Sequence, residues 1–263
     1  MYYFCNSAYY DTIIINNGGI MRYLITFSYD GTNFNGYQKQ DGLRSVQEEM
    51  EKALKYINGG VDTIITSSGR TDKGVHARCQ KAHVDINVEI TPYKLMRAMN
   101  SNLPSDIHVI KTEIVNDDFH ARYMVKEKEY QYLLNMGEYD PCMRNLVYQY
   151  GKKLDLEKMN EAIKYFVGTH NFKSFTPNKD KRENYVRTIN YASIKEKDGI
   201  LTFTFRGNGF IKYQIRNMVG FLIKVGEGKK NGKDIPKILK KEDRRMASIT
   251  AHAEGLYLTK VRY

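Results

Sequence analysis

Strand and helix patterns alternate along nearly the whole chain, and this alternation limits the folds that the sequence can adopt. Residues 22–29 are β-branched and apolar and precede a turn, which is typical of a strand. The first set of elements is predicted as strand 22–29, helix 46–57, strands 61–66 and 80–88, helix 92–99 and strand 108–115. The second set is predicted as strand 128–134, helix 155–167, strands 191–197 and 201–206, helix 212–225 and strand 256–262. The second half therefore repeats the first in outline, without a visible sequence repeat.

Two helix starts carry specific signals. Ser45-Val46-Gln47-Glu48 forms a capping box, in which the serine side chain and the glutamate satisfy free backbone N–H groups. Asn58-Gly59-Gly60 is typical of the end of that helix, and Thr91-Pro92 of the start of the next.

The order of elements predicts an α+β protein of two domains, 21–125 and 126–263, with a boundary near Val125. Because no long Gly, Ser or Pro linker separates them, we expect a continuous sheet or a tight interface. Residues 1–20 lack the features of a secretory signal. They are interpreted either as a translated ribosome-binding site ahead of a natural start at Met21, or as a short genuine extension.

The net charge of the chain limits the class of molecule that it can be expected to bind. The 263 residues carry a formal net charge of +11, which indicates a polyanion, either nucleic acid or an anionic membrane. No apolar run reaches the ~18–20 residues of a membrane-spanning helix, so we expect a soluble protein. The three cysteines, Cys5, Cys79 and Cys142, form no CxxC pair, which favours a reducing compartment and argues against a zinc knuckle or a disulfide framework.

The most informative segment is the polar loop 67–78 between two predicted strands. Its single acid, Asp72, is surrounded in the sequence by Arg70, Lys73 and Arg78. We expect these cations to hold Asp72 ionised even where burial would raise its pKa, which suits nucleophilic or base chemistry beside phosphate. An ordinary surface turn is the alternative on these residues alone.

Several motifs in order resemble those of the tRNA pseudouridine synthase A family. The loop contributes the run Ser68-Gly69-Arg70-Thr71-Asp72-Lys73-Gly74-Val75-His76-Ala77. The other matching segments are 29–38, 44–47, 102–107, 118–122, 128–132, 168–175, 216–220 and 253–258. The resemblance covers residues 21–263, and nine ordered motifs leave little room for chance or for the surface-turn interpretation of Asp72.

The resemblance implies an isomerase that breaks the N1–C1′ bond of uridine and rejoins the base through C5. Asp72 would be the essential carboxylate, acting either as a covalent nucleophile or by removing a sugar proton on the way to a glycal. Tyr130 would stack on the uracil and help to take the C5 proton. Arg216 would pair with Asp72 and hold it ionised.

The resemblance also implies contacts with RNA. Arg70 would fill the space left by the extruded base, because a base in a stem must leave the helix to be reached. His76 and Arg78 would be loop scaffold or phosphate contacts, and Lys73 and Arg122 further RNA contacts.

The family further implies two halves that resemble RRM or ferredoxin-like domains, with largely antiparallel sheets around a basic cleft. The expected substrate is uridine at positions 38–40 of the tRNA anticodon stem-loop. No cofactor and no metal are expected, nor a membrane partner. A homodimer in the cytoplasm is expected by analogy.

Some features depart from the family or remain open. Gln214 stands where members commonly carry Met, which bears on substrate detail rather than on the chemistry. The lysines and arginines of 229–245 are either a solvated helix face or contacts to the tRNA backbone. A non-catalytic RNA-binding protein and a hydrolase of a small phosphorylated ligand are competing hypotheses. The intact Asp72, Tyr130 and Arg216 argue against the first, and the missing Gly-rich phosphate loop against the second.

Overall fold

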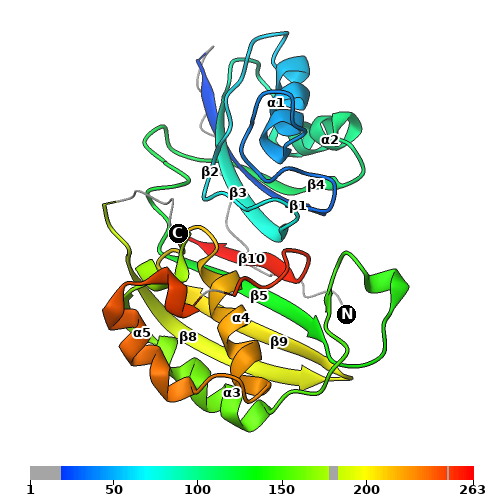
Figure 1. Ribbon diagram of the computed structural model, residues 1–263. Helices are drawn as coiled ribbons and strands as arrows, with labels where there is room; N and C mark the ends of the chain where they lie inside the picture. Colours follow the sequence, from blue (N-terminus) through cyan, green and yellow to red (C-terminus); the bar gives the residue numbers. More distant parts are fainter. Residues whose placement is uncertain (1–18, 178–182, 248) are drawn as a thin grey trace.

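One sheet runs through both halves of the chain (Figure 1). The computed structural model describes residues 19–177, 183–247 and 249–263. Its strands are β1 (Met21–Tyr29), β2 (Thr66–Ser67), β3 (His76–Ile86), β4 (Ile107–Ile114), β5 (Glu127–Asn135), β6 (Tyr148–Gln149), β7 (Gly168–Asn171), β8 (Val186–Lys197), β9 (Ile200–Gly207) and β10 (Leu256–Arg262). The main path follows the order β4-β1-β3-β10-β5-β9-β8-β7, with β2 beside β3 and β6 beside β5. Most pairs are antiparallel, so the predicted α+β class with a largely antiparallel sheet is confirmed.

The strand β10 joins the two halves. It pairs in parallel with β3, where Tyr257 lies opposite His76, and antiparallel with β5, where Leu258 lies opposite Tyr130. The strand that follows the loop of Asp72 and the strand that carries Tyr130 are therefore separated by one strand only. The sheet is continuous, as expected; the boundary near Val125 stays a prediction.

The helices cover the sheet in two groups (Figure 1). They are α1 (Val46–Ile57), α2 (Pro92–Asn102), α3 (Leu156–Ile163), α4 (Gln214–Gly226) and α5 (Ile235–Lys241), with short 3-10 turns at Pro141–Met143, Lys164–Phe166, Lys173–Phe175, Gly232–Asp234 and Arg244–Ala247. The first two belong to the N-terminal half, and α3, α4 and α5 lie against the β8 and β9 side of the other half. The core between helices and sheet is rich in aromatic residues, among them Phe166, Phe175 and Phe203.

The predicted helix starts are confirmed. The Ser45 hydroxyl accepts a hydrogen bond of 3.4 Å from the Glu48 N–H, and the Thr91 hydroxyl accepts one of 3.4 Å from the Lys94 N–H. The helix α1 ends where the Asn58 N–H bonds the Leu54 carbonyl, just before Gly59 and Gly60.

Several predicted boundaries are wrong. Only Thr66 of the strand predicted at 61–66 lies in a strand. Thr63 and Ile65 are buried, but the ladder with β3 begins only where Thr66 lies opposite His83. The helix predicted at 155–167 ends at Ile163 and tightens into a 3-10 turn. The helix predicted at 212–225 begins at Gln214, because Tyr213 takes a left-handed conformation.

The predicted extension 1–20 lies, apart from its last two residues, outside the described part of the chain. Within that part, no helix combines the length and the apolar character needed to cross a membrane.

Candidate active site

The loop between β2 and β3 carries Asp72 in a fixed conformation. The Val75 N–H bonds the Asp72 carbonyl at 3.1 Å, and the Gly74 N–H bonds the Phe34 carbonyl at 3.4 Å. Gly74 has a φ of +75°, a left-handed conformation that glycine adopts at little cost. The loop therefore makes a tight turn directly after Asp72.

A second segment, residues 29–37, packs against the loop and forms hydrogen bonds with it. The Tyr37 N–H bonds the Thr71 carbonyl at 3.1 Å, and the Tyr29 and Thr71 hydroxyls lie 2.8 Å apart. At Gly36, whose φ is +96°, an added Cβ would lie 2.9 Å from the Thr71 carbonyl oxygen. Two of the motifs quoted from the sequence thus form one packed unit around the residue that precedes Asp72.

Burial dominates the electrostatics of Asp72. It raises the pKa of the carboxyl above its ordinary value, and the charges of Arg216 and Lys212 oppose that rise without cancelling it. A hydrogen bond from the Tyr213 backbone N–H acts in the same direction as these charges. Among the described residues, no cationic side chain comes within 4.0 Å of the Asp72 oxygens.

The prediction that Arg70, Lys73 and Arg78 hold Asp72 ionised is therefore wrong. The cations that act on Asp72 come from the start of α4 instead, more than a hundred residues away in the sequence. The loop cations Arg70, Lys73 and Arg78 are exposed, whereas the fold brings the half-buried Arg216 and the exposed Lys212 close enough for their charges to act on Asp72.

The segment before α4 is held in a strained conformation beside Asp72. Tyr213 has a φ of 59°, which is uncommon for a residue other than glycine, and such strain gathers at functional sites. The turn is closed by Gln214, whose side-chain oxygen accepts a 2.9 Å hydrogen bond from the Ile211 N–H. Gln214 is fully buried, so the residue that departs from the family pattern satisfies a backbone N–H in the turn beside Asp72.

Tyr130 lies on β5 next to the same acid. Its ring is buried, and it meets the Phe210 ring edge-on at a centroid distance of 5.3 Å. Burial raises the pKa of the Tyr130 hydroxyl far above its ordinary value, and the charges of Tyr29 and Asp72 raise it further. The phenol is therefore neutral over the physiological range, and its hydroxyl lies within the field of Asp72.

Arg216 is oriented by two contacts. Its Nε donates a 2.8 Å hydrogen bond to the Ala251 carbonyl, and its guanidinium lies 5.0 Å from the centre of the Tyr213 ring. The structure thus places Asp72 within electrostatic range of both Arg216 and Tyr130, three residues predicted from distant motifs.

The residues predicted to contact RNA fall into two groups, exposed and buried. Arg70, Lys73, Arg78 and Arg122 are exposed on the surface. His76 is 1% exposed, accepts a 3.0 Å hydrogen bond at Nδ1 from the Gly31 N–H and stacks on Tyr257. This geometry favours the scaffold alternative for His76 over a phosphate contact.

Lys212 and Tyr213 are the functional candidates that sequence reasoning missed. Both lie in the segment 210–214 just before the matched 216–220 motif. The sequence pattern pointed to this region but indicated no role for either residue. Nothing in their residue types distinguishes them from surface residues. Only the left-handed turn at Tyr213 brings its N–H to Asp72.

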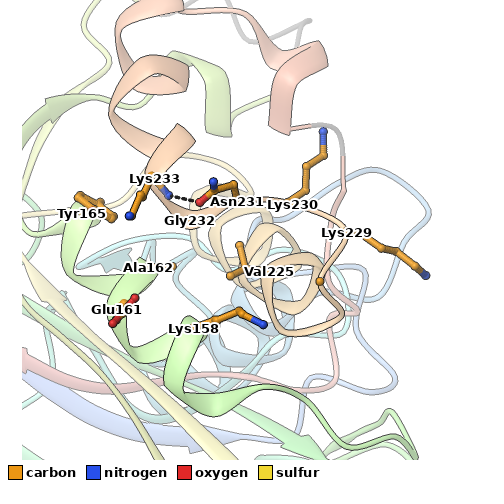
Figure 2. A pocket seen from close by; sticks show the side chains of 11 residues that line it. Lys158, Glu161, Ala162, Tyr165, Val225, Lys229, Lys230, Asn231, Gly232 and Lys233 are labelled. Carbon is orange, nitrogen blue, oxygen red and sulfur yellow. Dashed lines mark hydrogen bonds between the residues drawn. The ribbon is translucent and has the colours of Figure 1, made fainter.

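A basic pocket of about 490 Å³ lies elsewhere, between α3 and the end of α4 (Figure 2). Its lining includes Lys158, Lys229, Lys230 and Lys233 together with Glu161. The pocket reaches Val225, nine residues or ~14 Å along the helix from Arg216, so it is separate from the site of Asp72. Across the described residues, no cluster of His, Cys, Asp and Glu could hold a metal ion.

Comparisons of the sequence with a family profile and with individual proteins point to the same family. The profile of the family described as tRNA pseudouridine synthase matches residues 25–124 and 162–263. A "tRNA pseudouridine synthase A" of Streptococcus thermophilus (strain CNRZ 1066) is 43% identical over 247 residues, which cover 93% of this chain and 100% of the relative. One of Streptococcus equi subsp. equi (strain 4047) is 45% identical over 245 residues, covering 92% and 98%. A solved chain of a Cbf5-Nop10-Gar1 complex aligns with 89% of this chain and 57% of its own length, at 13% identity and a TM-score of 0.35.

Proposed function

The chain belongs to the tRNA pseudouridine synthase family, and from that premise we propose that it modifies the anticodon stem-loop of tRNA with Asp72 as the essential carboxylate. As a member of this family it is an isomerase that converts uridine in tRNA to pseudouridine. The reaction breaks the N1–C1′ bond, turns the base and forms a C5–C1′ bond. The proton of C5 leaves and N1 gains one, so substrate and product have the same composition.

The observation that carries the proposal is the setting of Asp72. A half-buried, partly desolvated acid that feels two cations and a backbone N–H can exist as a carboxylate at neutral pH and still be only weakly solvated. Such a carboxylate can attack the sugar or base, or remove a sugar proton to give a glycal, and both routes remain open. In either route its reactivity depends on the balance between burial and the charge of Arg216.

Tyr130 and Arg216 complete the proposed chemistry. The Tyr130 ring offers a flat apolar face for the uracil, and its hydroxyl lies in the field of Asp72, where it can take part in removing the C5 proton. Because the phenol is neutral, it acts as a proton acceptor only after it has lost its own proton. Arg216 keeps the carboxylate ionised while the bound base excludes water.

RNA is held by charge and by the exposed arginines of the loop. The net charge of +11 supports binding to the phosphate backbone. A uridine in a stem must leave the base stack before its glycosidic carbon becomes reachable, and exposed Arg70, two residues from Asp72, can fill the space that it leaves. Arg78 and Arg122 are proposed as phosphate contacts on the same grounds of exposure and charge.

Pseudouridine mapping in tRNA tests this function. Purified protein should convert uridines on the 3′ side of the anticodon stem-loop in unmodified tRNA, and Asp72→Asn protein should convert none. Conversion confined to another arm of the tRNA would overturn the proposed target while leaving the isomerase activity intact.

We further propose that the enzyme works as a homodimer in the cytoplasm, which the family resemblance and the tRNA substrate support. The mass in solution, measured by light scattering with and without tRNA, tests the dimer. A monomer that is fully active at nanomolar concentration would contradict it.

A further inference from the structure

A lysine side chain joins the loop that carries Asp72 to the strand that carries Tyr130. Lys128 lies in β5 two residues before Tyr130, so both side chains leave the same face of the strand. Its ammonium group donates a 2.5 Å hydrogen bond to the backbone carbonyl of Ser68, four residues before Asp72. The contact links the stem of the loop directly to the second half of the chain.

The other bonds at this stem come from the first half. The Ser68 N–H bonds the Lys81 carbonyl, its hydroxyl bonds the Gln80 side chain, and the Gln80 amide bonds the Gly69 carbonyl. These contacts fix the loop on β3, within its own half. The bond from Lys128 to Ser68 connects the loop to β5, and hence the segment of Asp72 to the strand of Tyr130.

The residue beside this contact, Gly69, leaves room for the ammonium group. A Cβ added to Gly69 would lie 2.6 Å from the Lys128 Nζ atom, so the end of the lysine side chain would have to shift. Gly69 does not have a positive φ, so its backbone would tolerate alanine. An added methyl group therefore conflicts with the ammonium group alone and pushes it away from the Ser68 carbonyl.

The position is unfavourable for a charge. Burial lowers the pKa of the Lys128 ammonium to about 8, and the positive charges of Arg122 and Arg187 also lower it. Among the described residues, no carboxylate lies within 4.0 Å of the ammonium to compensate. Stability alone does not explain a lysine in this place, because an uncharged residue would avoid the cost of burial.

We propose that Lys128 is a positioning residue, which sets the separation of the Asp72 carboxylate and the Tyr130 ring through its bond to Ser68. The inference rests on the proposed function. Reaction rates depend steeply on such separations, and a shift of ~1 Å can cost about 100-fold. Lys128 itself acts on the loop backbone and is not required to contact the uridine.

The first test replaces Lys128 by methionine, which keeps most of the side-chain stem but removes the donor. The single-turnover rate should fall about 10- to 100-fold, while the Kd for tRNA changes less than about threefold. Lys126→Met is the matched control, since Lys126 is exposed two residues earlier and its loss should leave the rate unchanged. A wild-type rate in Lys128→Met, or a loss confined to tRNA affinity, would overturn the proposal.

The second test retains Lys128 but moves its ammonium group away from Ser68 by a substitution at Gly69. Gly69→Ala should reproduce the loss of rate, and in a Lys128→Ala background, where the space is free, it should add less than about twofold. Fully additive losses would show that the two residues act separately and would contradict the proposal. Because Gly69→Ala retains Lys128, the test stands even where a lysine variant folds poorly. Wild-type protein that converts no uridine would instead refute the proposed function.

Discussion

The hydroxyl of Tyr29 lies 2.8 Å from the hydroxyl of Thr71, so a strand near the start of the described chain fixes the residue that precedes Asp72. Both side chains are buried, which protects the bond from competition with water. The proposed nucleophile or base is thus positioned partly through its neighbour Thr71.

Asp72→Asn should abolish the release of tritium from C5-labelled uridine while tRNA affinity stays nearly unchanged, because the amide keeps the shape but loses the charge. It should also raise the melting temperature slightly. Burial raises the pKa of Asp72 in the folded protein, so the ionised form lowers stability above that pKa, and this cost disappears as pH falls. Kinetics and calorimetry on the same preparation check both effects; a turnover above a hundredth of wild type would refute the assignment.

Arg216→Ala should lower the rate most strongly at low pH. Removal of the cation that most opposes the effect of burial raises the pKa of Asp72 further, so a larger fraction of the acid is protonated at each pH. The rate should therefore recover as pH rises, and Arg216→Lys should recover at lower pH than the alanine variant. Single-turnover rates against pH under saturating enzyme measure this. A variant as fast as wild type at every pH would place Arg216 outside the active site.

Tyr130→Phe separates the stacking surface from the hydroxyl. We expect tRNA affinity to stay within about threefold, because the ring remains, and the release of the C5 proton to slow by about 100-fold or more. Because burial raises the pKa of Tyr130, the wild-type rate should not fall as pH approaches 10 through titration of this group. Wild-type proton release from the phenylalanine variant would limit Tyr130 to stacking.

Gln214→Met restores the residue common in the family but should destabilise this protein. The buried Ile211 N–H would lose its 2.9 Å hydrogen bond, a loss of about 1–3 kcal/mol in the free energy of unfolding. Denaturant unfolding checks this, with the exposed Gln38→Met as control. Unchanged stability would mean that methionine lets the turn at Tyr213 find another partner.

The lysines of the basic pocket in Figure 2 are tested by salt dependence. If Lys230 and Lys233 hold the tRNA backbone, replacing both by glutamine should flatten the plot of log affinity against log salt by about 0.7–0.9 per lost phosphate contact. Affinity measurements between low and moderate salt give the slope. An unchanged slope would assign these lysines to a solvated helix face.

The sequence predicted the helices and strands better than it predicted the electrostatics around Asp72, while the catalytic roles of the site residues stay predictions. Capping signals located α1 and α2, because they depend on contacts within three or four residues. The cations around Asp72 were misplaced, because Lys212 and Arg216 reach it only through tertiary packing. The contact from Lys128 to Ser68 spans 60 residues, and no local pattern encodes it.

The place of β10 in the sheet has a consequence for the timing of synthesis. Residues 256–262 lie between β3 and β5, so the two halves of the sheet lack their shared strand until translation has reached the end of β10. A nascent chain on the ribosome carries the Asp72 loop and the Tyr130 strand, but the strand that sets them side by side is still missing. The Asp72 loop and the Tyr130 strand therefore reach their final arrangement only after β10 has joined the sheet.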